Sequence, residues 1–598
     1  VGPDGRLYFS VGDRGFNVKS REGRQFEGPR NGAVFRCDPD GRNFEVVHRG
    51  LRNPQELAFD QFGNLFADDN NCDKGDHGRL VYVCDGGDSG WNMAYQTIPD
   101  PYLTGPWHAE RMWHLPHAGQ PAWIVPCVGS IGTGPSGFLF TSGTSLPDRY
   151  KNSFIMCNYT GDGGLEAWKL KPQGAGFEIV DYHDFLKPIR ATDAEFGPDG
   201  KLYVSDFVDL KWDGGSAGGR IYTVFDPAKL NDPAVKEAKE LFAEGFGKRK
   251  PAELAKLLEH PDYKVRQRAQ FALAEKRDAD TLTKVAKGNA NQLARLHGLW
   301  GLWQISRKDL AVLKTVVELL TDADAEVRAQ AAKICGDRRH ADAVPQLLGL
   351  LDDASPRVKY FAAQALGQLK HKPAAEPLFF LAKTAGDADP FLRHAAVTAL
   401  ARLNDPDAIN RRATDPSAAV RLAAVLAQRK LGDKRVSQFL TDADLTVRTE
   451  AARAVHDLPL ESEYPKLAAT LTAADTGKSD PLARRAVHAA YRLGGAEQAK
   501  AIFGVVVNPA YSPPVRGEAL ACLRNWAEPG NRDRVTGFWR PLAKRDGKDV
   551  AAVVEAGLND LLAKTSGQLQ TDAVGLISKL GVKADEGQFA AWAADAKK

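Results

Sequence analysis

One short phrase recurs nine times in the C-terminal part of the chain, and it limits the possible folds more than any other feature. In each copy an apolar residue precedes a basic residue, and a small apolar residue follows three positions later, as in Val265, Arg266 and Ala269. A period of this length predicts a stack of similar helical units, each of which buries its apolar face against the next. The basic residues lie 27 to 36 positions apart, at Arg266, Arg295, Arg328, Lys359, Arg393, Arg421, Arg448, Arg484 and Arg516.

The sequence around this phrase is helical in character. Beyond residue 226 the chain is rich in Ala, Leu, Lys, Arg and Glu at helical spacing, and acidic or proline-containing turns often precede the phrase. The pattern is similar to the HEAT repeat, a pair of antiparallel helices stacked into a solenoid. We predict a helical linker over residues 229–248, an all-α HEAT-repeat solenoid over 249–533 and a helical cap over 534–598, where amphipathic spacing continues without the phrase.

Two roles are possible for the repeated basic residues. Each could bind a ligand on a concave face of the solenoid. Alternatively, each follows an acidic turn, such as residues 322–324, Asp-Ala-Asp, and could bind a turn carboxylate of a neighbouring repeat. We favour the second role, which predicts a ladder of ion pairs along the solenoid.

The N-terminal part has a different period. Residues 1 to about 225 consist of short segments rich in Val, Tyr, Phe and Trp, separated by Gly, Pro, Asp and Asn, which is typical of an all-β domain. The run Gly-Pro-Asp-Gly at residues 2–5 returns at 197–200, with a looser version at 60–63. Units roughly 60 to 75 residues apart predict propeller blades with long loops. We therefore predict a partial β-propeller of about four blades over residues 1–228.

Composition excludes several classes of partner. With 598 residues the chain is too long for one hydrophobic core. Its 79 Lys and Arg residues nearly balance its 76 Asp and Glu residues, so neither nucleic acid nor an anionic membrane is expected as a partner. No apolar run approaches the roughly 18 residues of a membrane span.

The seven cysteines carry no metal or haem motif. No pair has the spacing Cys-x-x-Cys, which excludes a thioredoxin-like motif, a zinc ribbon and a c-type haem attachment within the chain. We expect most of them to be buried thiols, and a disulfide between Cys72 and Cys84 is the alternative.

The densest group of polar residues lies between Leu51 and Trp91. Residues 52–55, Arg-Asn-Pro-Gln, form a tight turn with forked hydrogen-bond donors, which suit carboxylate, quinone or amide oxygens. A second strand ends in residues 68–76, where Asp and Asn supply the oxygen ligands that calcium prefers. The alternative is an ordinary β-turn followed by a solvated loop.

The order of these elements resembles the quinoprotein sugar dehydrogenases, six-bladed propellers related to glucose and sorbosone dehydrogenases that hold pyrroloquinoline quinone (PQQ) on a calcium ion. It looks closest to the planctomycete and verrucomicrobial putative membrane-bound dehydrogenase type, which joins such a propeller to HEAT repeats and often to a cytochrome c domain. The resemblance implies six blades, of which about four lie in this chain, and we expect the others to precede Val1.

The resemblance also implies roles for individual residues. The quinone would be bound by side chains of the polar turn and by one arginine before a later strand, namely Arg52, Asn53, Gln55 and Arg190. The calcium ion would be held by main-chain carbonyls and carboxylates of the acidic loop, namely Asn71, Cys72, Asp73 and Asp76.

A catalytic histidine of the family would take the proton of the substrate hydroxyl, oriented by an aspartate that matches Asp13. The histidine itself would precede Val1, so we expect the chain as given to lack its catalytic base. Two basic positions of the family are replaced here, by Tyr159 and Thr192. Their loss weakens the predicted carboxylate pocket.

The resemblance implies an oxidoreductase that oxidises a sugar or a sugar-derived alcohol or aldehyde. Electrons would pass to a c-type cytochrome domain or protein, with haem c only in a domain outside this chain, and a protein partner would bind the HEAT surface. Export to the periplasm or cell surface is implied as well. The alternative is a non-catalytic propeller that binds carbohydrate or protein, with the solenoid as its scaffold.

Overall fold

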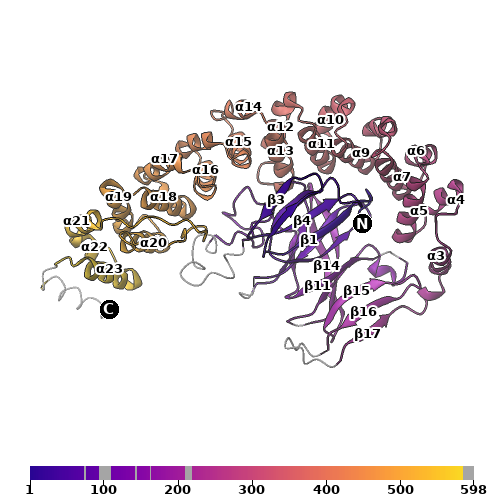
Figure 1. Cartoon of the computed structure of the whole chain (residues 1–598), viewed down its shortest axis with the longest axis horizontal. Coiled ribbons are helices and arrows are strands. Elements are labelled where there is room, and N and C mark those ends of the chain that lie inside the picture. Colours follow the sequence, from indigo (N-terminus) through magenta and orange to yellow (C-terminus); the bar gives the residue numbers. More distant parts are fainter. Residues whose placement is uncertain are drawn as a thin grey trace. The chain divides into compact units, whose positions relative to one another are not determined.

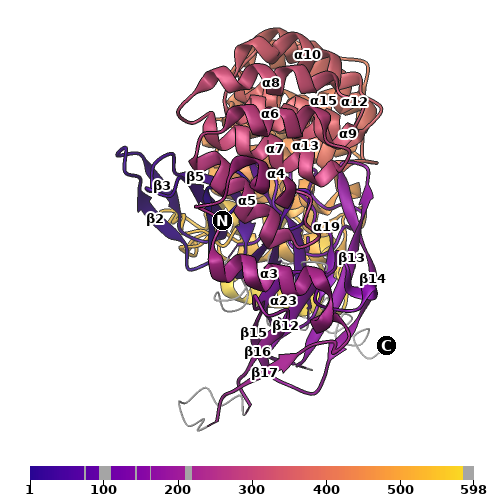
Figure 2. The ribbon, with the colours of Figure 1, turned by 90° about the vertical axis from the view of Figure 1, so that its right-hand side faces the viewer.

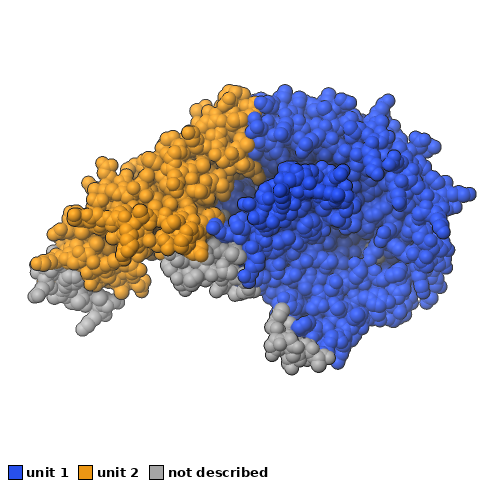
Figure 3. All heavy atoms as spheres, in the orientation of Figure 1, with its two compact units in different colours: residues 1–96, 112–404 blue, residues 97–111, 405–598 orange. Residues whose placement is uncertain are grey.

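The computed structural model describes residues 1–72, 76–92, 110–141, 144–161, 163–208, 218–583 and 587. The chain divides into two compact units, which Figure 3 distinguishes by colour. Unit 1 comprises residues 1–96 and 112–404, and unit 2 comprises residues 97–111 and 405–598. The border between the units lies within the helical part of the chain, and the domain boundaries predicted from composition stay a prediction.

The described residues of unit 1 form four small sheets and one separate hairpin. The hairpin joins β2 (Phe16–Lys19) to β3 (Gln25–Gly28) and projects from the other strands (Figure 2). The first sheet has the order β1 (Leu7–Val11), β4 (Gly32–Cys37), β5 (Glu45–Leu51) and β9 (Gly87–Asp88). The second has the order β6 (Pro54–Phe59), β7 (Leu65–Asp69), β8 (Gly78–Tyr82) and β10 (Gly129–Ile131).

The third sheet has the order β11 (Pro135–Phe140), β12 (Phe154–Asn158), β13 (Leu165–Gln173) and β14 (Gly176–Leu186). The fourth has β15 (Ala191–Phe196), β16 (Leu202–Asp206) and β17 (Arg220–Val224). All neighbouring strands in the four sheets are antiparallel except β5 and β9.

The second, third and fourth sheets pack through their first strands, as propeller blades do, and the first sheet packs through β1. The strand β11 packs against β6 on one side and β15 on the other, and β1 packs against β6. Apolar residues fill the space between sheets, for example Val34, Leu65 and Val81 between the first and second. The described strands form blade-like sheets but do not close into a barrel, which confirms the predicted partial propeller.

The repeated Gly-rich turn positions the second strand of a blade. In the turn before β7, the Asp60 carboxylate accepts hydrogen bonds from the amides of Phe62 and Asn64, both at 2.9 Å. Gly63 has φ +70°, a conformation that glycine adopts without strain. The equivalent turns precede β1 and β16, so β1 corresponds to the second strand of the other sheets.

The helices continue from unit 1 into unit 2. Short 3₁₀ segments link them, and Lys434–Thr441 replaces an α-helix in one repeat. The helices of unit 1 are α3 (Pro233–Glu244), α4 (Pro251–Leu257), α5 (Tyr263–Glu275), α6 (Ala279–Gly288), α7 (Gln292–Ile305), α8 (Leu313–Glu318), α9 (Ala325–Asp337), α10 (Val344–Gly349), α11 (Pro356–Gln368), α12 (Ala375–Ala385) and α13 (Pro390–Leu403).

Unit 2 is helical in its described residues. Its helices are α14 (Pro406–Asn410), α15 (Ala418–Leu431), α16 (Leu445–Asp457), α17 (Tyr464–Ala469), α18 (Asp480–Leu493), α19 (Ala496–Val507), α20 (Pro513–Arg524), α21 (Lys548–Ala556), α22 (Leu558–Ala563) and α23 (Gly567–Leu580). Helices α18 to α23 share one hydrophobic core. The helical repeats confirm the predicted HEAT solenoid.

The predicted ladder of ion pairs is present at four of the nine repeat positions, whereas Arg393 pairs with Asp387 in its own turn and Arg516 donates to main-chain carbonyls. Arg328 donates from Nε and Nη2 to Asp353 in the turn of the next repeat, at 2.8 and 3.0 Å. Arg421 binds Asp442 in the same way, at 2.7 and 2.8 Å. Arg295 and Arg448 pair with the turn carboxylates of Asp322 and Asp475. These repeat arginines therefore join neighbouring repeats, as predicted.

Within unit 1 the sheets pack on one side of the solenoid. Helices α5, α7, α9, α11 and α13 face the sheets, whereas α6, α10 and α12 lie on the outer side (Figure 1). Arg36 on β4 binds Asp337 at the end of α9, at 3.2 and 3.3 Å. Asp85, after β8, accepts from both terminal nitrogens of Arg402 on α13, at 2.7 and 2.9 Å.

These interface charges are buried and paired. The Arg36 side chain is 8% exposed and that of Asp337 is 4% exposed. Burial acts to raise the pKa of Asp337, but the positive charges of Arg36 and Arg6 outweigh this effect and leave that pKa below its usual value. The helices that face the sheets therefore bind the strand-rich part of the same chain.

All seven cysteines lie within the described residues and are buried thiols, which confirms the expectation for most of them. The interpretation of Cys72 and Cys84 as a disulfide is wrong for this structure. In the described part of the chain, no helix combines the length and apolar character required to cross a bilayer.

Replacing Arg36 by Met should destabilise unit 1 by about 3–5 kcal/mol, because Asp337 would lose its partner in a buried position. The urea unfolding transition measures this loss. The double variant Arg36→Met/Asp337→Leu should recover most of it, and Arg42→Met, at an exposed position, serves as the control. A single-variant loss no larger than that of the control would contradict the importance of this pair.

Candidate functional site

The predicted polar turn lies at one end of the sheets, where second strands end and first strands begin. In the second sheet β6 and β7 are antiparallel, and their register places Asp69 opposite Pro54. The end of β7 therefore lies beside the turn that contains Arg52 and Asn53. The polar turn and the residue before the acidic loop therefore lie side by side.

Asp69 organises this turn. Its carboxylate accepts hydrogen bonds from the amide of Arg52, at 2.9 and 3.1 Å, and from the amide of Asn53, at 2.9 Å. It also forms an ion pair with Arg79 at the start of β8. Asp69 is fully buried, so its negative charge requires these donors. The main chain of the turn is thereby fixed.

Other sheets contain the same arrangement. The residue that ends the second strand accepts a hydrogen bond from an amide just before the first strand. In the third sheet, Asn158 Oδ1 accepts from the Gly134 amide at 2.7 Å. In the fourth, Asp206 Oδ1 accepts from the Arg190 amide at 2.9 Å. The contact is therefore a repeated structural element of the blades rather than a feature of one site.

Asp13, the predicted catalytic residue, follows β1 and lies beside the turn. Its amide donates to the Arg52 carbonyl at 2.6 Å, and its carboxylate accepts from Trp91 Nε1 at 2.9 Å. Burial raises the pKa of Asp13, while the hydrogen bond from Trp91 and the charge of Arg52 oppose this effect. The structure thus brings Asp13, Arg52 and Asn53 together.

Three of the predicted calcium ligands share one closed loop, and Asp73 lies outside the described residues. Both oxygens of Asp76 accept from the Cys72 amide, at 2.9 and 3.0 Å, and Asn71 Nδ2 donates to the Asp76 carbonyl at 3.2 Å. Oxygen donors of this kind suit calcium. The Asp76 carboxylate already accepts hydrogen bonds from the Cys72 amide. A cation at this loop would therefore share that carboxylate with the amide.

The two other predicted quinone-binding residues, Gln55 and Arg190, do not take part in the contacts between Asp13, Asp69 and the polar turn. Gln55 is exposed on β6. Arg190 precedes the first strand of the fourth sheet, and its guanidinium donates to the Gly161 carbonyl at 2.6 Å. Thr192, which replaces a basic residue of the family, contacts the Ser205 hydroxyl at 2.8 Å. The donors therefore fit an anionic quinone in part: Arg52 and Asn53 lie together, while Arg190 belongs to another blade.

The sequence reasoning missed Glu56, which lies on β6 directly after the polar turn. Burial, together with the negative charges of Asp193 and Glu195, raises its pKa to about 7. Its carboxylate accepts from the Phe138 amide at 2.6 Å, so it links the second sheet to the third. The signal in the sequence is an acidic residue inside a mostly apolar first strand.

The sequence reasoning also missed Arg79. This buried side chain pairs with Asp69 and donates to the carbonyls of Ser89 and Trp113, at 2.9 and 2.7 Å. The signal in the sequence is a charged residue directly before the apolar residues 80–82 of one strand. Because the Arg79 guanidinium is paired with Asp69, Arg79 stabilises the turn and does not provide a free positive charge for a ligand.

Two family profiles match parts of the chain. Residues 1–210 match a domain of unknown function, DUF7133. Residues 313–384, 345–411 and 379–456 match HEAT repeats. No curated protein sequence matches the chain.

Solved structures resemble parts of the chain at low identity. The PQQ-bound aldose sugar dehydrogenase of Streptomyces coelicolor is 22% identical over 37% of this chain and 59% of its own length, with a TM-score of 0.25. An engineered protein is 20% identical over 56% of this chain and 95% of its own, with a TM-score of 0.27. Kap95p, in a structure with RanGDP, is 13% identical over 59% of this chain and 52% of its own, with a TM-score of 0.35.

Asp69→Ala should destabilise unit 1 by about 3–5 kcal/mol, because it leaves the Arg79 charge buried and two turn amides without their acceptor. Asp206→Ala, at the equivalent position of the fourth sheet, removes a hydrogen-bond acceptor but no ion pair within the described part of the chain. We expect it to cost about 1–3 kcal/mol. Urea unfolding compares the two, and equal losses would argue against a special role for the ion pair.

Glu56→Gln should raise the thermal stability more at pH 8 than at pH 5. The pKa of Glu56 is higher in the folded chain than in the unfolded chain, so its ionised form opposes folding. This cost grows as the pH rises from about 4.5 to about 7 and stays constant above that. Thermal unfolding at both pH values measures the effect, with the exposed Glu27→Gln as control. A pH-independent change would contradict the assignment.

Proposed function

We propose that the chain is part of a quinoprotein-like oxidoreductase that acts on a sugar or a sugar-derived alcohol or aldehyde. One observation carries the proposal: Asp13, Arg52 and Asn53 lie together beside the oxygen-rich loop that begins after Asp69. This end of the sheets supplies forked donors, a buried carboxylate and calcium-type ligands at neighbouring positions.

In this proposal each group has a defined task. Arg52 and Asn53 would bind carboxylate or quinone oxygens of PQQ, and carbonyls of Asn71 and Cys72 would hold calcium with Asp76. Bound PQQ supplies a quinone that accepts two electrons from the substrate. Asp13, fixed by Trp91, would orient a basic group that takes the proton of the substrate hydroxyl.

The solenoid is a scaffold-like repeat region, and we propose that its remaining surface binds a protein partner. That partner would be a c-type cytochrome domain or protein that receives the electrons. Haem chemistry of this kind, together with a sugar substrate, suits the periplasm or cell surface, which is the location we propose.

A second candidate is a propeller that binds carbohydrate or protein without catalysis. Two observations favour it. The carboxylates at the ends of the second strands are used to hold main-chain amides, as in Asp69 and Asp206. The guanidinium of Arg190 is bound to a main-chain carbonyl, which leaves fewer cations for an anionic quinone.

Binding of PQQ in the presence of calcium, measured by equilibrium dialysis and by quenching of tryptophan fluorescence, tests the proposal on the purified chain. We expect retention of the quinone and a loss of affinity of roughly 10- to 100-fold in Arg52→Ala, as expected for a charge-assisted hydrogen bond. Arg42→Ala, which alters an exposed arginine, should bind normally.

Activity is a separate measurement. Dye reduction with a panel of sugars should be calcium-dependent in a chain that carries the expected upstream histidine. A chain that retains no quinone under any of these conditions overturns the redox proposal. Retention of a polysaccharide on a glycan array would then support the binding function.

A further inference from the structure

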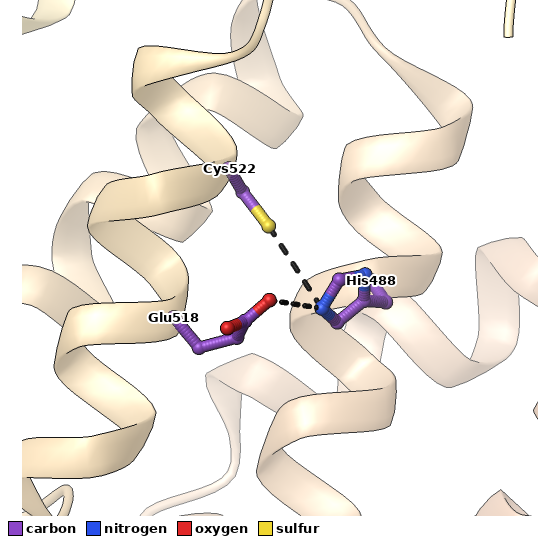
Figure 4. Close-up of side chains that lie close together, drawn as sticks. All are labelled: His488, Glu518 and Cys522. Atoms are coloured by element: carbon purple, nitrogen blue, oxygen red, sulfur yellow. Dashed lines mark hydrogen bonds and ion pairs between the residues drawn. The ribbon is translucent and has the colours of Figure 1, made fainter. Parts of the chain in front are cut away.

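Unit 2 contains a group of side chains whose chemistry the propeller does not explain. His488 lies on α18, and Glu518 and Cys522 lie on α20 (Figure 4). Glu518 and Cys522 are four residues apart, so both project from one face of α20. Figure 4 shows them pointing toward His488 on the facing helix. One ligand atom from each of the three residues lies within 4.8 Å of the other two.

The three donors are close and sheltered from solvent. His488 Nε2 lies 2.8 Å from Glu518 Oε1 and 4.0 Å from Cys522 Sγ. His488 is 2% exposed and Cys522 is fully buried. Zn²⁺ binds imidazole nitrogen, thiolate and carboxylate at roughly 2.0–2.3 Å. Small rotations of the side chains would therefore place all three donors around one ion.

Arg534 is the competitor for such an ion. Its Nε and Nη2 donate to the two oxygens of Glu518, at 2.6 and 2.9 Å. Glu518 Oε1 thus serves both Arg534 and His488. A divalent cation between the three ligands would replace the hydrogen that His488 and Glu518 share and would weaken the hold of Arg534 on that oxygen.

A cavity of about 300 Å³ leads to the group. His488 and Arg534 both line it, together with Arg492, Arg532 and Arg540. The cavity is large enough for several water molecules, so an ion at His488 could be reached from solvent and could keep a water ligand. Three protein ligands and one water is the arrangement of zinc sites that are open to reaction.

We propose that His488, Glu518 and Cys522 form a zinc-binding site, with a fourth ligand position that opens toward the arginine-lined cavity. Mixed nitrogen, sulfur and oxygen donors favour Zn²⁺ over calcium or magnesium, which take oxygen ligands. Binding releases the protons of the thiol and of the imidazole nitrogen that becomes a ligand. The five arginines of the cavity lining outnumber its two acids, Glu528 and Asp533, so the cavity would favour a small anion at the fourth position. The proposal is independent of the redox function proposed above.

Zinc titration of the untagged, chelator-stripped chain tests the site, with a chromogenic chelator as competitor. We expect one tightly bound Zn²⁺ per chain. His488→Gln and Cys522→Ser should each weaken binding by more than about 100-fold, since loss of a ligand costs more than loss of an outer-shell contact. Arg534→Gln should tighten binding several-fold, because it removes the cation that competes for Glu518.

Cobalt provides a spectroscopic readout that identifies a thiolate ligand directly. Co²⁺ bound by a thiolate has a charge-transfer band in the near ultraviolet, which should appear in the wild-type chain and be absent from Cys522→Ser. Cys335→Ser, which alters another fully buried thiol on α9, should retain the band and the affinity. Helical circular dichroism checks that every variant is folded.

Each possible result of these titrations either supports or contradicts the proposed zinc site. Stoichiometric zinc that is lost in Cys522→Ser and retained in Cys335→Ser supports the site. Absence of stoichiometric zinc from the folded wild-type chain overturns it. Zinc that persists in folded Cys522→Ser also overturns it, because the ion would then be bound elsewhere, and weaker binding in Arg534→Gln would contradict the proposed competition.

Discussion

The architecture of unit 1 depends on buried ion pairs between its sheets and its helices. Arg36 with Asp337, and Asp85 with Arg402, join positions about 300 residues apart in the sequence. Each carboxylate would be costly to bury alone, so the sheets and the helices stabilise each other only when packed together. The solenoid in this unit therefore binds its own chain, and the face available to another protein is smaller than a nine-unit repeat suggests. The arginines that bind the turn of the next repeat stabilise the solenoid separately from this interface, because they join neighbouring helix pairs.

Local periodicity made the fold class predictable. The repeated phrase indicated the solenoid because each copy fixes one helix and one turn, and the role of Arg328 followed from the acidic turns beside it. The blade-like sheets were predictable for the same reason, from a turn whose glycine and aspartate have local roles. The interface between the sheets and the helices was not predictable, because Asp85 and Asp337 look like ordinary loop and helix-end acids in the sequence. Their partners are distant in the sequence, and no short-range pattern marks them.

The candidate site was predictable to a similar degree. The resemblance implied one site for Arg52, Asn53 and Asp13, and in the structure the Asp13 amide donates to the Arg52 carbonyl. The sequence did not indicate that Asp69 would hold the turn by accepting hydrogen bonds from the amides of Arg52 and Asn53. The type of a side chain says little about the hydrogen bonds that the main chain of the same residue makes. Glu56 was missed because its pKa depends on strands from two other sheets. The side chains of the proposed zinc site on α18 and α20 were missed because the histidine is 30 residues from the glutamate that it contacts.

The buried pairing of sheets with helices also limits how such a chain can change over generations. A recombination event at the junction of strands and helices would exchange one set of sheets for another while leaving the old helices in place. Their carboxylates and guanidinium groups would then face unmatched surfaces. The propeller part and the first half of the solenoid should therefore be inherited as one block, and substitutions at Asp337 or Asp85 should be accompanied by changes at their partners.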